Sequence, residues 1–367
     1  MRVTVIGGGN SGYAMAAHLS KYGNEVTLWN RSSSTIATIM ETKKIHCTGF
    51  IHEVIPIHMV TDNIKEALKD PDVILITTPA HSHKGLAELI AKNIKKSALI
   101  VLNPGRTFGA LEFEYVYNMY NKNYKQTIAE TQTIIYTCRK IGDDGVNIIA
   151  LKDSVLIAGT GTTSSEEIIS RLPACIRQYF KPAKSIVETS IGNVGMILHC
   201  APMILNVGWT ESKFYNYKYY HDGVSPTVSE FIEEIDKERV AVSKALGYEV
   251  ESTKEWFIRT YHLEGETLYE CIQNNKAYDT IYAPPSLEHR YVIEDIPCGL
   301  VPLEAMGLKL GVDMTYTSLT IDLASKLMKR DFRETGRNLE YLDTTFIKNW
   351  QMTITGGGVV SNEQYEY

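Results

Sequence analysis

The stretch that decides the fold is RVTVIGGGNSG, residues 2–12, at the start of the chain. Its β-branched and apolar half is typical of a buried strand, and its second half is a turn with three spaced glycines. In this spacing Gly7 permits the tight turn, Gly9 lets a ligand approach the backbone, and Gly12 allows close helix packing. A helical segment and then a second strand over 25–29 follow. The sequence therefore predicts a βαβ unit that binds a nicotinamide dinucleotide, with the pyrophosphate on the helix N-terminus.

The residues inside the turn and at the end of the second strand are candidate cofactor contacts. Asn10 and Ser11 lie inside the turn, and Asn30 and Arg31 follow the second strand. An acidic residue at this strand end would bind the adenosine ribose 2′-hydroxyl, but no carboxylate is present, and Arg31 is able to pair with a 2′-phosphate. The pattern favours NADP(H). It leaves NAD(H) open, because a solvated surface charge is the alternative interpretation of Arg31.

The first half of the chain alternates short β-branched runs with amphipathic segments, which is typical of a doubly wound α/β fold with a mostly parallel sheet. Asp62 is expected to cap a short helix over 64–68. The expected strands are 2–6, 25–29, 54–60, 73–77, 98–102, 127–129, 146–152 and 155–157.

Beyond about residue 185 the strand signal fades, and the rest of the chain is predicted to be helical with long loops. The clearest helix is expected over 225–246, with Pro226 in its first turn and Gly247 at its end. We therefore predict an N-terminal dinucleotide-binding Rossmann domain over 1–184, an all-helical substrate domain over 185–354, and a loose tail over 355–367.

Composition narrows the range of partners. Hydrophobic residues at 44% and charged residues at 22% are ordinary for a folded protein, and a net charge of -6 offers no broad basic field. We therefore expect small-molecule partners, and neither nucleic acid nor membrane. The six cysteines show no metal-ligand spacing, so no metal site is expected. Without a signal peptide or a long apolar run, a cytoplasmic location is expected, and the oligomeric state stays open, with a homodimer as one arrangement.

Two residues after the expected strand over 73–77 are further candidates for contact with the cofactor. Pro79 and His81 follow that strand at its carboxyl end, where ligands bind in open α/β sheets. The alternative for His81 is a simply solvated loop histidine.

Candidate catalytic residues come from two separate stretches. His199 is a single titratable group in the apolar run 194–205, for which a hydrogen-bonded core histidine is the alternative interpretation. The mixed run 288–297 contains Arg290, whose planar guanidinium is suited to a substrate carboxylate, and Asp295, which is suited to orient a catalytic histidine. The alternative for this run is a solvated charged face.

These residues resemble those of the opine dehydrogenases, the octopine/nopaline dehydrogenase family. The resemblance covers nearly the whole chain apart from the tail. It rests on the glycine turn, NPGRTFG over 103–109, AET over 129–131, YTCR over 136–139, the run around His199, VSP over 224–226 and RYVIEDIPCGLVP over 290–302.

The resemblance implies a dinucleotide-binding domain followed by an all-helical substrate domain, with the active site between them. It also implies a reaction, in which an amino acid condenses with a 2-keto acid, typically pyruvate, and NAD(P)H reduces the resulting imine to a secondary amine. By resemblance, His199 and Asp295 take the places of the catalytic histidine and aspartate, and Arg290 that of the substrate-binding arginine.

Two alternatives stay open at this point. One is another two-domain reductase of the glycerol-3-phosphate or 2-ketopantoate type, although those enzymes rely on a lysine as proton donor where this chain offers His199. The other is a protein that senses NADPH without turnover.

Overall fold

The computed structural model describes residues 1–342 and divides into two compact units, residues 1–190 and the residues from 191 onward. The boundary predicted at 184/185 falls a few residues before this division. The predicted tail over 355–367, and the end of the predicted helical domain after residue 342, lie outside the described residues.

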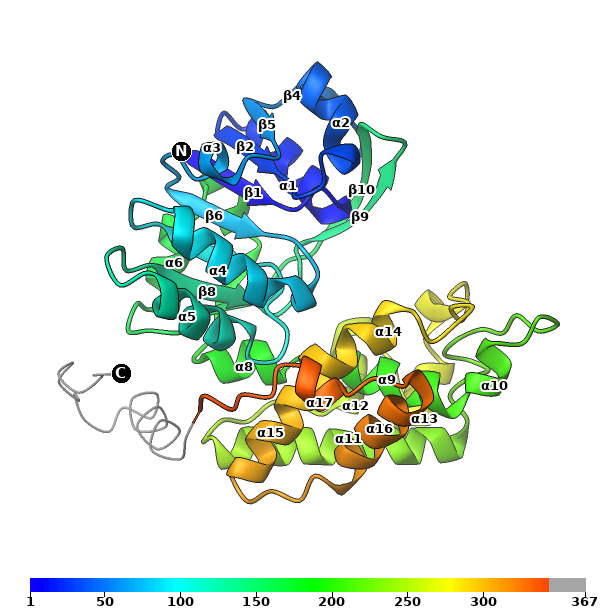
Figure 1. Ribbon diagram of the computed structural model, residues 1–367. Coiled ribbons are helices and arrows are strands. Elements are labelled where there is room, and N and C mark those ends of the chain that lie inside the picture. The colour runs from blue at the N-terminus through cyan, green and yellow to red at the C-terminus, as the bar shows by residue number, and fades with distance from the viewer. Residues whose placement is uncertain (343–367) are drawn as a thin grey trace. The chain divides into compact units, whose positions relative to one another are not determined.

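The first unit is built on an eight-stranded sheet (Figure 1). In spatial order the strands are β12 (Phe180–Pro182), β11 (Val155–Gly159), β8 (Thr127–Thr131), β7 (Leu99–Leu102), β6 (Val73–Ile76), β1 (Arg2–Ile6), β2 (Glu25–Trp29) and β5 (Met59–Thr61). All neighbours are parallel except β11 and β8. Because the chain moves outward from β1 in both directions, the switch point of this doubly wound sheet lies between β1 and β6.

The helices of the first unit occupy the connections that parallel strands require. Figure 1 shows α4 and α5 side by side against the sheet, and these two helices also pack on each other. The helices are α1 (Asn10–Lys21), α2 (Ser33–Thr42), α3 (Ile64–Ala67), η1 (Ala80–Ser82), α4 (His83–Asn93), α5 (Gly109–Tyr120), α6 (Ser165–Arg171), α7 (Ala174–Arg177) and α8 (Ile186–Ile191), the last of which crosses the division between the units.

A second, four-stranded sheet covers the outer side of α1. Its strands run in the order β4 (Val54–Pro56), β3 (Lys44–Gly49), β10 (Gly145–Leu151) and β9 (Tyr136–Ile141). Helix α1 contacts β9 and β10 as well as β2 of the main sheet, and its residues from Gly12 to Leu19 are buried without a break. The helix that carries the glycine turn therefore lacks the polar face of a surface helix.

Two local predictions were wrong. The strand expected over 54–60 is two strands in different sheets, since β4 pairs with β3 whereas β5 pairs with β2. The apolar run is continuous in sequence, but Pro56 cannot donate to a ladder, and the pairing partner changes after it. The cap of α3 is Asn63, whose side chain accepts from the Lys65 amide, and not Asp62.

The buried histidine of α1 makes the stability of the first unit depend on pH. His18 is 2% exposed, and its Nδ1 lies 2.9 Å from the Tyr136 hydroxyl of β9. Burial, aided by Lys21, lowers the pKa of His18 to about 4. Between pH 6.5 and 4 this histidine is therefore protonated in the unfolded chain but neutral in the folded unit. The free energy of unfolding consequently falls as the pH drops through this range.

We expect His18 alone to lower the free energy of unfolding of the first unit by roughly 2 kcal/mol when the pH falls from 7 to 5. Urea unfolding of the wild type and of His18→Gln at both pH values measures the difference. The free energy of unfolding of His18→Gln should change less between the two pH values than that of the wild type. An identical change in both proteins would contradict the lowered pKa of His18.

The second unit is helical throughout its described part, apart from an isolated bridge between Lys218 and Tyr282. The long helix α11 contacts four of its neighbours, α9, α13, α15 and α16. None of the helices within residues 1–342 is both long and apolar enough to cross a membrane. The helices are α9 (Gly195–Leu205), α10 (Val207–Thr210), α11 (Pro226–Ala245), α12 (Thr253–Tyr261), α13 (Leu268–Gln273), η2 (Lys276–Tyr278), α14 (Arg290–Ile293), the π-helix η3 (Ile296–Leu300), α15 (Val301–Lys309), α16 (Thr315–Met328) and α17 (Phe332–Thr335).

The start of α11 follows the sequence prediction closely. Ser225 is the N-cap, with its hydroxyl accepting from the Val228 amide, and Pro226 occupies the first turn. This cap satisfies one of the amide groups that a helix start leaves without a partner.

Candidate active site

The glycine turn lies at the carboxyl end of β1, and its three glycines have different tasks. Gly7 has a φ of +118°, and a Cβ on Gly12 would lie 1.7 Å from the Gly7 carbonyl oxygen, so both positions require glycine. A Cβ on Gly9 would meet nothing within 4 Å. Gly9 is the N-cap of α1 and provides no side chain, so the amides of the first helical turn have no capping side chain. This is the cradle that a pyrophosphate requires.

Three of the predicted cofactor residues have side chains that bond within the protein. The Asn30 side-chain oxygen Oδ1 accepts from the Gly8 amide at 2.9 Å and holds the turn against the end of β2. Asn10 accepts from the Lys140 amide at 2.8 Å, and the Ser11 side chain bonds to Cys138, so both fasten the turn to β9. What these residues can offer a ligand is mainly their backbone.

The first turn of α2 brings together basic and hydroxyl groups. Arg31 is exposed immediately before this helix, and the hydroxyls of Ser32 and Ser34 lie 2.7 Å apart. Lys140 joins them from β9, because its ammonium group donates to the Thr35 carbonyl oxygen at 3.1 Å. Sequence reasoning missed Lys140, which is distant in the chain and reaches this corner only through the second sheet.

The loop after β6 lies at the same edge of the sheet. The Thr77 hydroxyl donates to the carbonyl oxygen of Ile6 at 3.0 Å, which ties the loop to the end of β1. Pro79 and His81 follow and are exposed, whereas His83 is buried at the start of α4. The structure thus brings Pro79 and His81 to the edge that carries the glycine turn.

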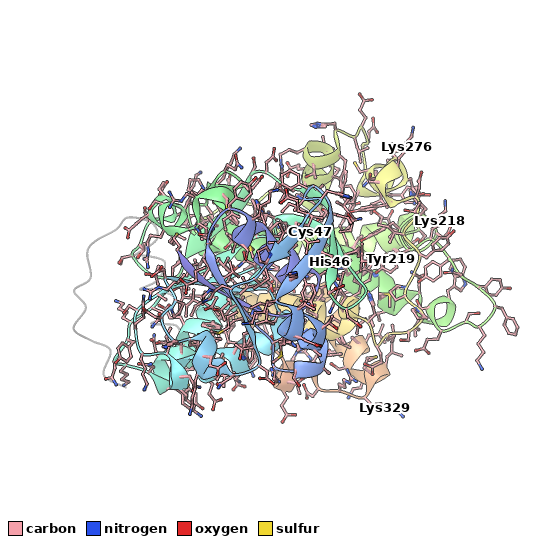
Figure 2. All side chains as sticks on the ribbon, turned by 90° about the horizontal axis from the view of Figure 1, so that it is seen from above. His46, Cys47, Lys218, Tyr219, Lys276 and Lys329 are labelled. Atoms are coloured by element: carbon pink, nitrogen blue, oxygen red, sulfur yellow. The ribbon has the colours of Figure 1, made fainter. Side chains whose placement is uncertain are left out.

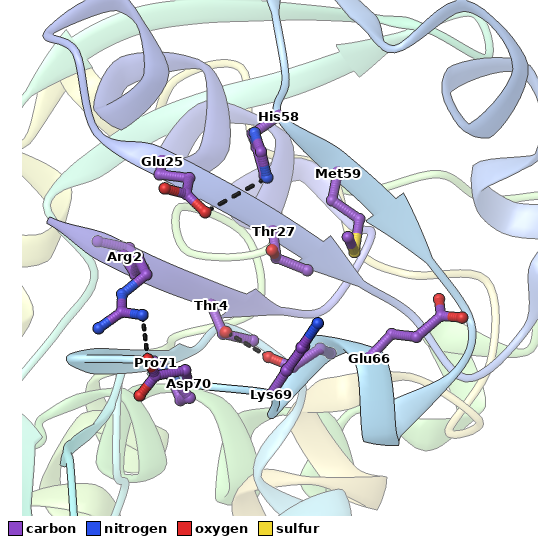
Figure 3. Close-up of a pocket in the computed structure, with 12 residues that line it drawn as sticks. Arg2, Thr4, Glu25, Thr27, His58, Met59, Glu66, Lys69, Asp70 and Pro71 are labelled. Atoms are coloured by element: carbon purple, nitrogen blue, oxygen red, sulfur yellow. Dashed lines mark hydrogen bonds and ion pairs between the residues drawn. The ribbon is translucent and has the colours of Figure 1, made fainter.

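A cavity of about 390 Å³ opens at the opposite, amino-terminal edge of the sheet, beside the starts of β1, β2 and β5 (Figure 3). Several of its polar side chains are paired within the protein, since the Thr4 hydroxyl donates to the Ala67 carbonyl oxygen at 2.6 Å and His58 lies 3.3 Å from Glu25. Because ligands of open α/β sheets bind outside the carboxyl ends of the strands, this cavity is not the cofactor site.

In the second unit, the structure places His199 beside Asp295. His199 lies on α9 with its Nδ1 2.7 Å from the Asp295 carboxylate oxygen Oδ2, a distance typical of a charge-assisted hydrogen bond. The His199 side chain is 12% exposed and that of Asp295 only 1%. Since Nδ1 faces the carboxylate, Nε2 is the ring nitrogen directed away from it, and the pair has the geometry of a histidine oriented for proton transfer.

A close contact between backbones makes this pair possible. Asp295 precedes the π-helix η3, and a Cβ on Gly299 in η3 would lie 2.9 Å from the Cβ of Met196 on α9. The glycine therefore lets η3 approach α9 closely enough for the carboxylate to reach the imidazole. π-helical turns are frequent at functional sites.

Aromatic side chains surround His199. The Tyr291 ring is stacked on the imidazole with 3.8 Å between centroids and 14° between planes. The Tyr219 hydroxyl donates to the His199 backbone carbonyl oxygen at 2.6 Å. Tyr219 is fully buried, whereas Lys218, the residue before it, lies toward the periphery of the view in Figure 2. The tyrosine-rich stretch over 214–220 thus supports the candidate catalytic histidine at its buried end.

Arg290 is the first residue of α14 and is exposed. No carboxylate within residues 1–342 forms an ion pair with it. The charges of Arg290 and His199 both act on His289, so the guanidinium and the imidazole lie around the same histidine in the second unit. An exposed, unpaired arginine here is suited to a carboxylate from solution.

The two halves of the chain match different family models. A model described as NAD/NADP octopine/nopaline dehydrogenase, alpha-helical domain, matches residues 182–328. A model described as NAD-dependent glycerol-3-phosphate dehydrogenase N-terminus matches residues 2–105. An opine dehydrogenase of Arthrobacter sp. (strain 1C) is 35% identical over 339 residues, which are 92% of this chain and 94% of that relative. The chain belongs to the opine dehydrogenase family. The helical half distinguishes it from the glycerol-3-phosphate dehydrogenases, whose N-terminal model it also matches.

Solved structures of opine dehydrogenases share the fold. Octopine dehydrogenase in complex with NADH and agmatine has a TM-score of 0.76 at 18% identity, covering 99% of this chain and 100% of that chain. The same enzyme with NADH and pyruvate has a TM-score of 0.74. Yersinopine dehydrogenase with NADP+ bound has a TM-score of 0.70 at 14% identity, covering 97% of this chain and 98% of that chain. The predicted family, fold class and general activity are confirmed, and the chain is an NAD(P)-dependent oxidoreductase.

Proposed function

We propose that this opine dehydrogenase condenses the amino group of an amino acid with a 2-keto acid, pyruvate in the first instance, and reduces the product with NADPH to an N-(1-carboxyalkyl) amino acid. The observation that carries the proposal is the pair of His199 and Asp295 at 2.7 Å, held in the helical unit characteristic of the family. The solved relative with NADH and pyruvate supports the choice of keto acid.

In the proposed reaction His199 moves protons during the condensation. Attack of the amine on the ketone gives a carbinolamine, whose hydroxyl leaves as water only when it receives a proton. Nε2 of a protonated His199 delivers that proton, while Asp295 stabilises the imidazolium through Nδ1. The imine carbon then accepts a hydride, which the reduced nicotinamide supplies when bound.

Arg290 is proposed to bind a substrate carboxylate. Both substrates carry a carboxylate, and the planar guanidinium is able to hold one of them through two parallel hydrogen bonds. Such an arrangement fixes the ketone carbon relative to His199 and limits rotation of the bound acid.

NADP(H) is proposed as the preferred cofactor. Support comes from the corner at the first turn of α2, where Arg31, Lys140 and the serine hydroxyls gather and where no carboxylate follows β2. A 2′-phosphate carries a charge that these groups complement, whereas the 2′-hydroxyl of NAD(H) gains little from them.

Arg31→Ala is expected to weaken NADPH binding by about ten- to a hundredfold and to leave NADH binding nearly unchanged, because only NADPH loses a charge-assisted hydrogen bond. Fluorescence titration with each cofactor measures the two dissociation constants. Arg259→Ala, which changes an exposed arginine of the second unit paired with Glu251, serves as the control. An equal loss for both cofactors, or no loss for either, would speak against the proposed role.

The proposed activity is tested by following NADPH and NADH oxidation with pyruvate and each of the common amino acids, with mass spectrometry of the products. Pyruvate alone and each amino acid alone are the controls for simple ketone reduction and for background oxidation. The proposal requires oxidation that depends on both substrates together. Oxidation with the keto acid alone would favour a hydroxy-acid dehydrogenase instead.

A further inference from the structure

The hydrogen bond from His199 Nδ1 to Asp295 does not by itself fix the plane of the His199 ring. The contact between Nδ1 and the carboxylate restrains one ring nitrogen, but a joint change of the side-chain torsions χ1 and χ2 can keep this contact while the imidazole plane tilts. Proton transfer from Nε2 requires both the direction and the plane of the ring to be set, because the proton leaves along the lone-pair direction. A second constraint on the ring is therefore needed.

Tyr291 supplies that constraint. Its ring covers one face of the imidazole at 3.8 Å and 14°, close to the distance at which two flat rings touch. A tilt of the imidazole plane would drive the ring into the phenol ring. The stack and the hydrogen bond act at right angles to each other, and together they leave the ring one orientation.

Tyr291 is itself held in place by several contacts. Its backbone amide donates to Nδ1 of His289 at 3.4 Å, and its hydroxyl forms a hydrogen bond with Tyr220. Its ring also lies 5.1 Å from that of Tyr219, whose hydroxyl bonds to the His199 carbonyl oxygen. The stacked tyrosine is therefore a fixed surface and not a mobile side chain.

We propose that Tyr291 is a positioning residue for His199, whose ring stack fixes the imidazole plane and stabilises its protonated form for the condensation. The proposal rests on the proposed function of His199. The negative face of an aromatic ring attracts a cation that lies over it, so the stack favours imidazolium over imidazole.

Some of the other charged groups around His199 stabilise a positive charge on its ring, and others destabilise it. Asp295 stabilises the imidazolium, and the buried carboxyl of Glu294 follows α14 in the same stretch. Burial, as the largest cause, and then the charges of Arg290 and His199 lower the pKa of His289, whereas Asp295 raises it. A positive charge on His289 is therefore disfavoured beside His199. Tyr219 bonds only to the backbone and adds no charge.

The test compares Tyr291→Leu, which removes the stack, with Tyr291→Phe, which keeps it and removes only the hydroxyl. Tyr282→Leu, the same change at an exposed tyrosine of the same unit, is the matched control. His199 is titrated by NMR of the histidine Cε1–H groups, with its signal assigned by its loss in His199→Gln. Steady-state kinetics with NADPH, pyruvate and the best amino acid are measured on the same proteins.

In Tyr291→Leu we expect the His199 titration midpoint to move down by about half a pH unit. We expect kcat to fall about tenfold with little change in KM, because the ring loses its orientation. Tyr291→Phe keeps the stack and loses only the hydrogen bond to Tyr220, so it should retain most of the wild-type titration midpoint and kcat. The Tyr282→Leu control should match the wild type in both measurements. The proposal is overturned if Tyr291→Leu leaves titration and kcat unchanged, or if Tyr291→Phe is as impaired as Tyr291→Leu. A wild type without turnover would refute the proposed function, while the NMR comparison would still decide the role of the stack.

Discussion

His199→Ala is expected to lower kcat by about a hundred- to ten-thousandfold while NADPH binds with unchanged affinity, as positioned general acids typically contribute this much. The loss follows from the chemistry of the condensation, since the carbinolamine hydroxyl cannot leave without a proton. Cofactor affinity should persist because the glycine turn and the first turn of α2 belong to the other unit of the chain. Stopped-flow turnover and a separate fluorescence titration measure the two quantities.

Asp295→Asn is the companion variant to His199→Ala. It keeps the shape of the buried side chain but removes the charge that stabilises the imidazolium at 2.7 Å from Nδ1. We expect kcat to fall. We also expect the midpoint of the alkaline limb of the pH–activity profile to move to lower pH, because less of the histidine is protonated at a given pH. Wild-type activity in His199→Ala would show that another group moves the proton and would overturn the assignment.

Asp236→Ala is expected to lower the free energy of unfolding of the second unit by about 3 to 5 kcal/mol, which is typical when one partner of a buried ion pair is removed. Arg239 is fully buried, and its Nε donates to Asp236 Oδ1 at 2.8 Å. Without the carboxylate, the guanidinium keeps its charge in a site shielded from water.

The same network links separate parts of the helical unit. The Arg239 Nη1 and Nη2 groups donate to the carbonyl oxygens of Ile191 and Glu251 at 2.8 and 2.7 Å. Asp236 also accepts from the Thr253 amide at 2.6 Å at the start of α12. Loss of the carboxylate therefore loosens the end of α8 and the start of α12 at once.

Urea unfolding measures this effect, and Glu234→Ala is the control. Glu234 lies on the same helix and forms an exposed pair with Lys237, so its removal should change stability little. Equal free energies of unfolding for Asp236→Ala and Glu234→Ala would contradict the prediction that the buried ion pair contributes more to stability than the exposed one.

The parts of the fold that follow from local rules could be predicted from the sequence. The βαβ unit around Gly7 and Gly12 is specified by residues within one short stretch, because steric limits on glycine act locally. The start of α11 is specified in the same way by Ser225 and Pro226.

The second sheet could not be predicted in the same way. Strand β3 of this sheet pairs with β10 across about a hundred residues, so no neighbouring residues announce the pairing. The apolar run that contains Val54 gives no sign that its two ends join different sheets. Asn63 and Asp62 are both good capping residues, and only the backbone geometry selects Asn63.

In the candidate site, too, residues with a local sequence signal could be predicted, whereas contacts between distant elements could not. His199 was singled out as a titratable group in an apolar run and Asp295 as part of a mixed charged run, and the family resemblance implied their catalytic roles. The two residues are 96 positions apart, and no spacing rule joins them. The contributions of Tyr291 and Lys140 escaped prediction, because each depends on a contact between elements distant in the sequence. The tyrosine-rich stretch around Tyr219 had no interpretation until its hydroxyl was placed on the His199 carbonyl oxygen.

The measurement that tests the central proposal most directly is transfer of deuterium from NADPH deuterated at C4 to the product of pyruvate and an amino acid. The proposed reaction predicts a secondary amine that contains the carbon skeletons of both substrates and one deuterium on the former ketone carbon when the transferred position is labelled. The proposal would be contradicted by deuterated lactate as the product. It would also be contradicted if the product contained no deuterium with NADPH labelled at either of the two C4 hydrogen positions.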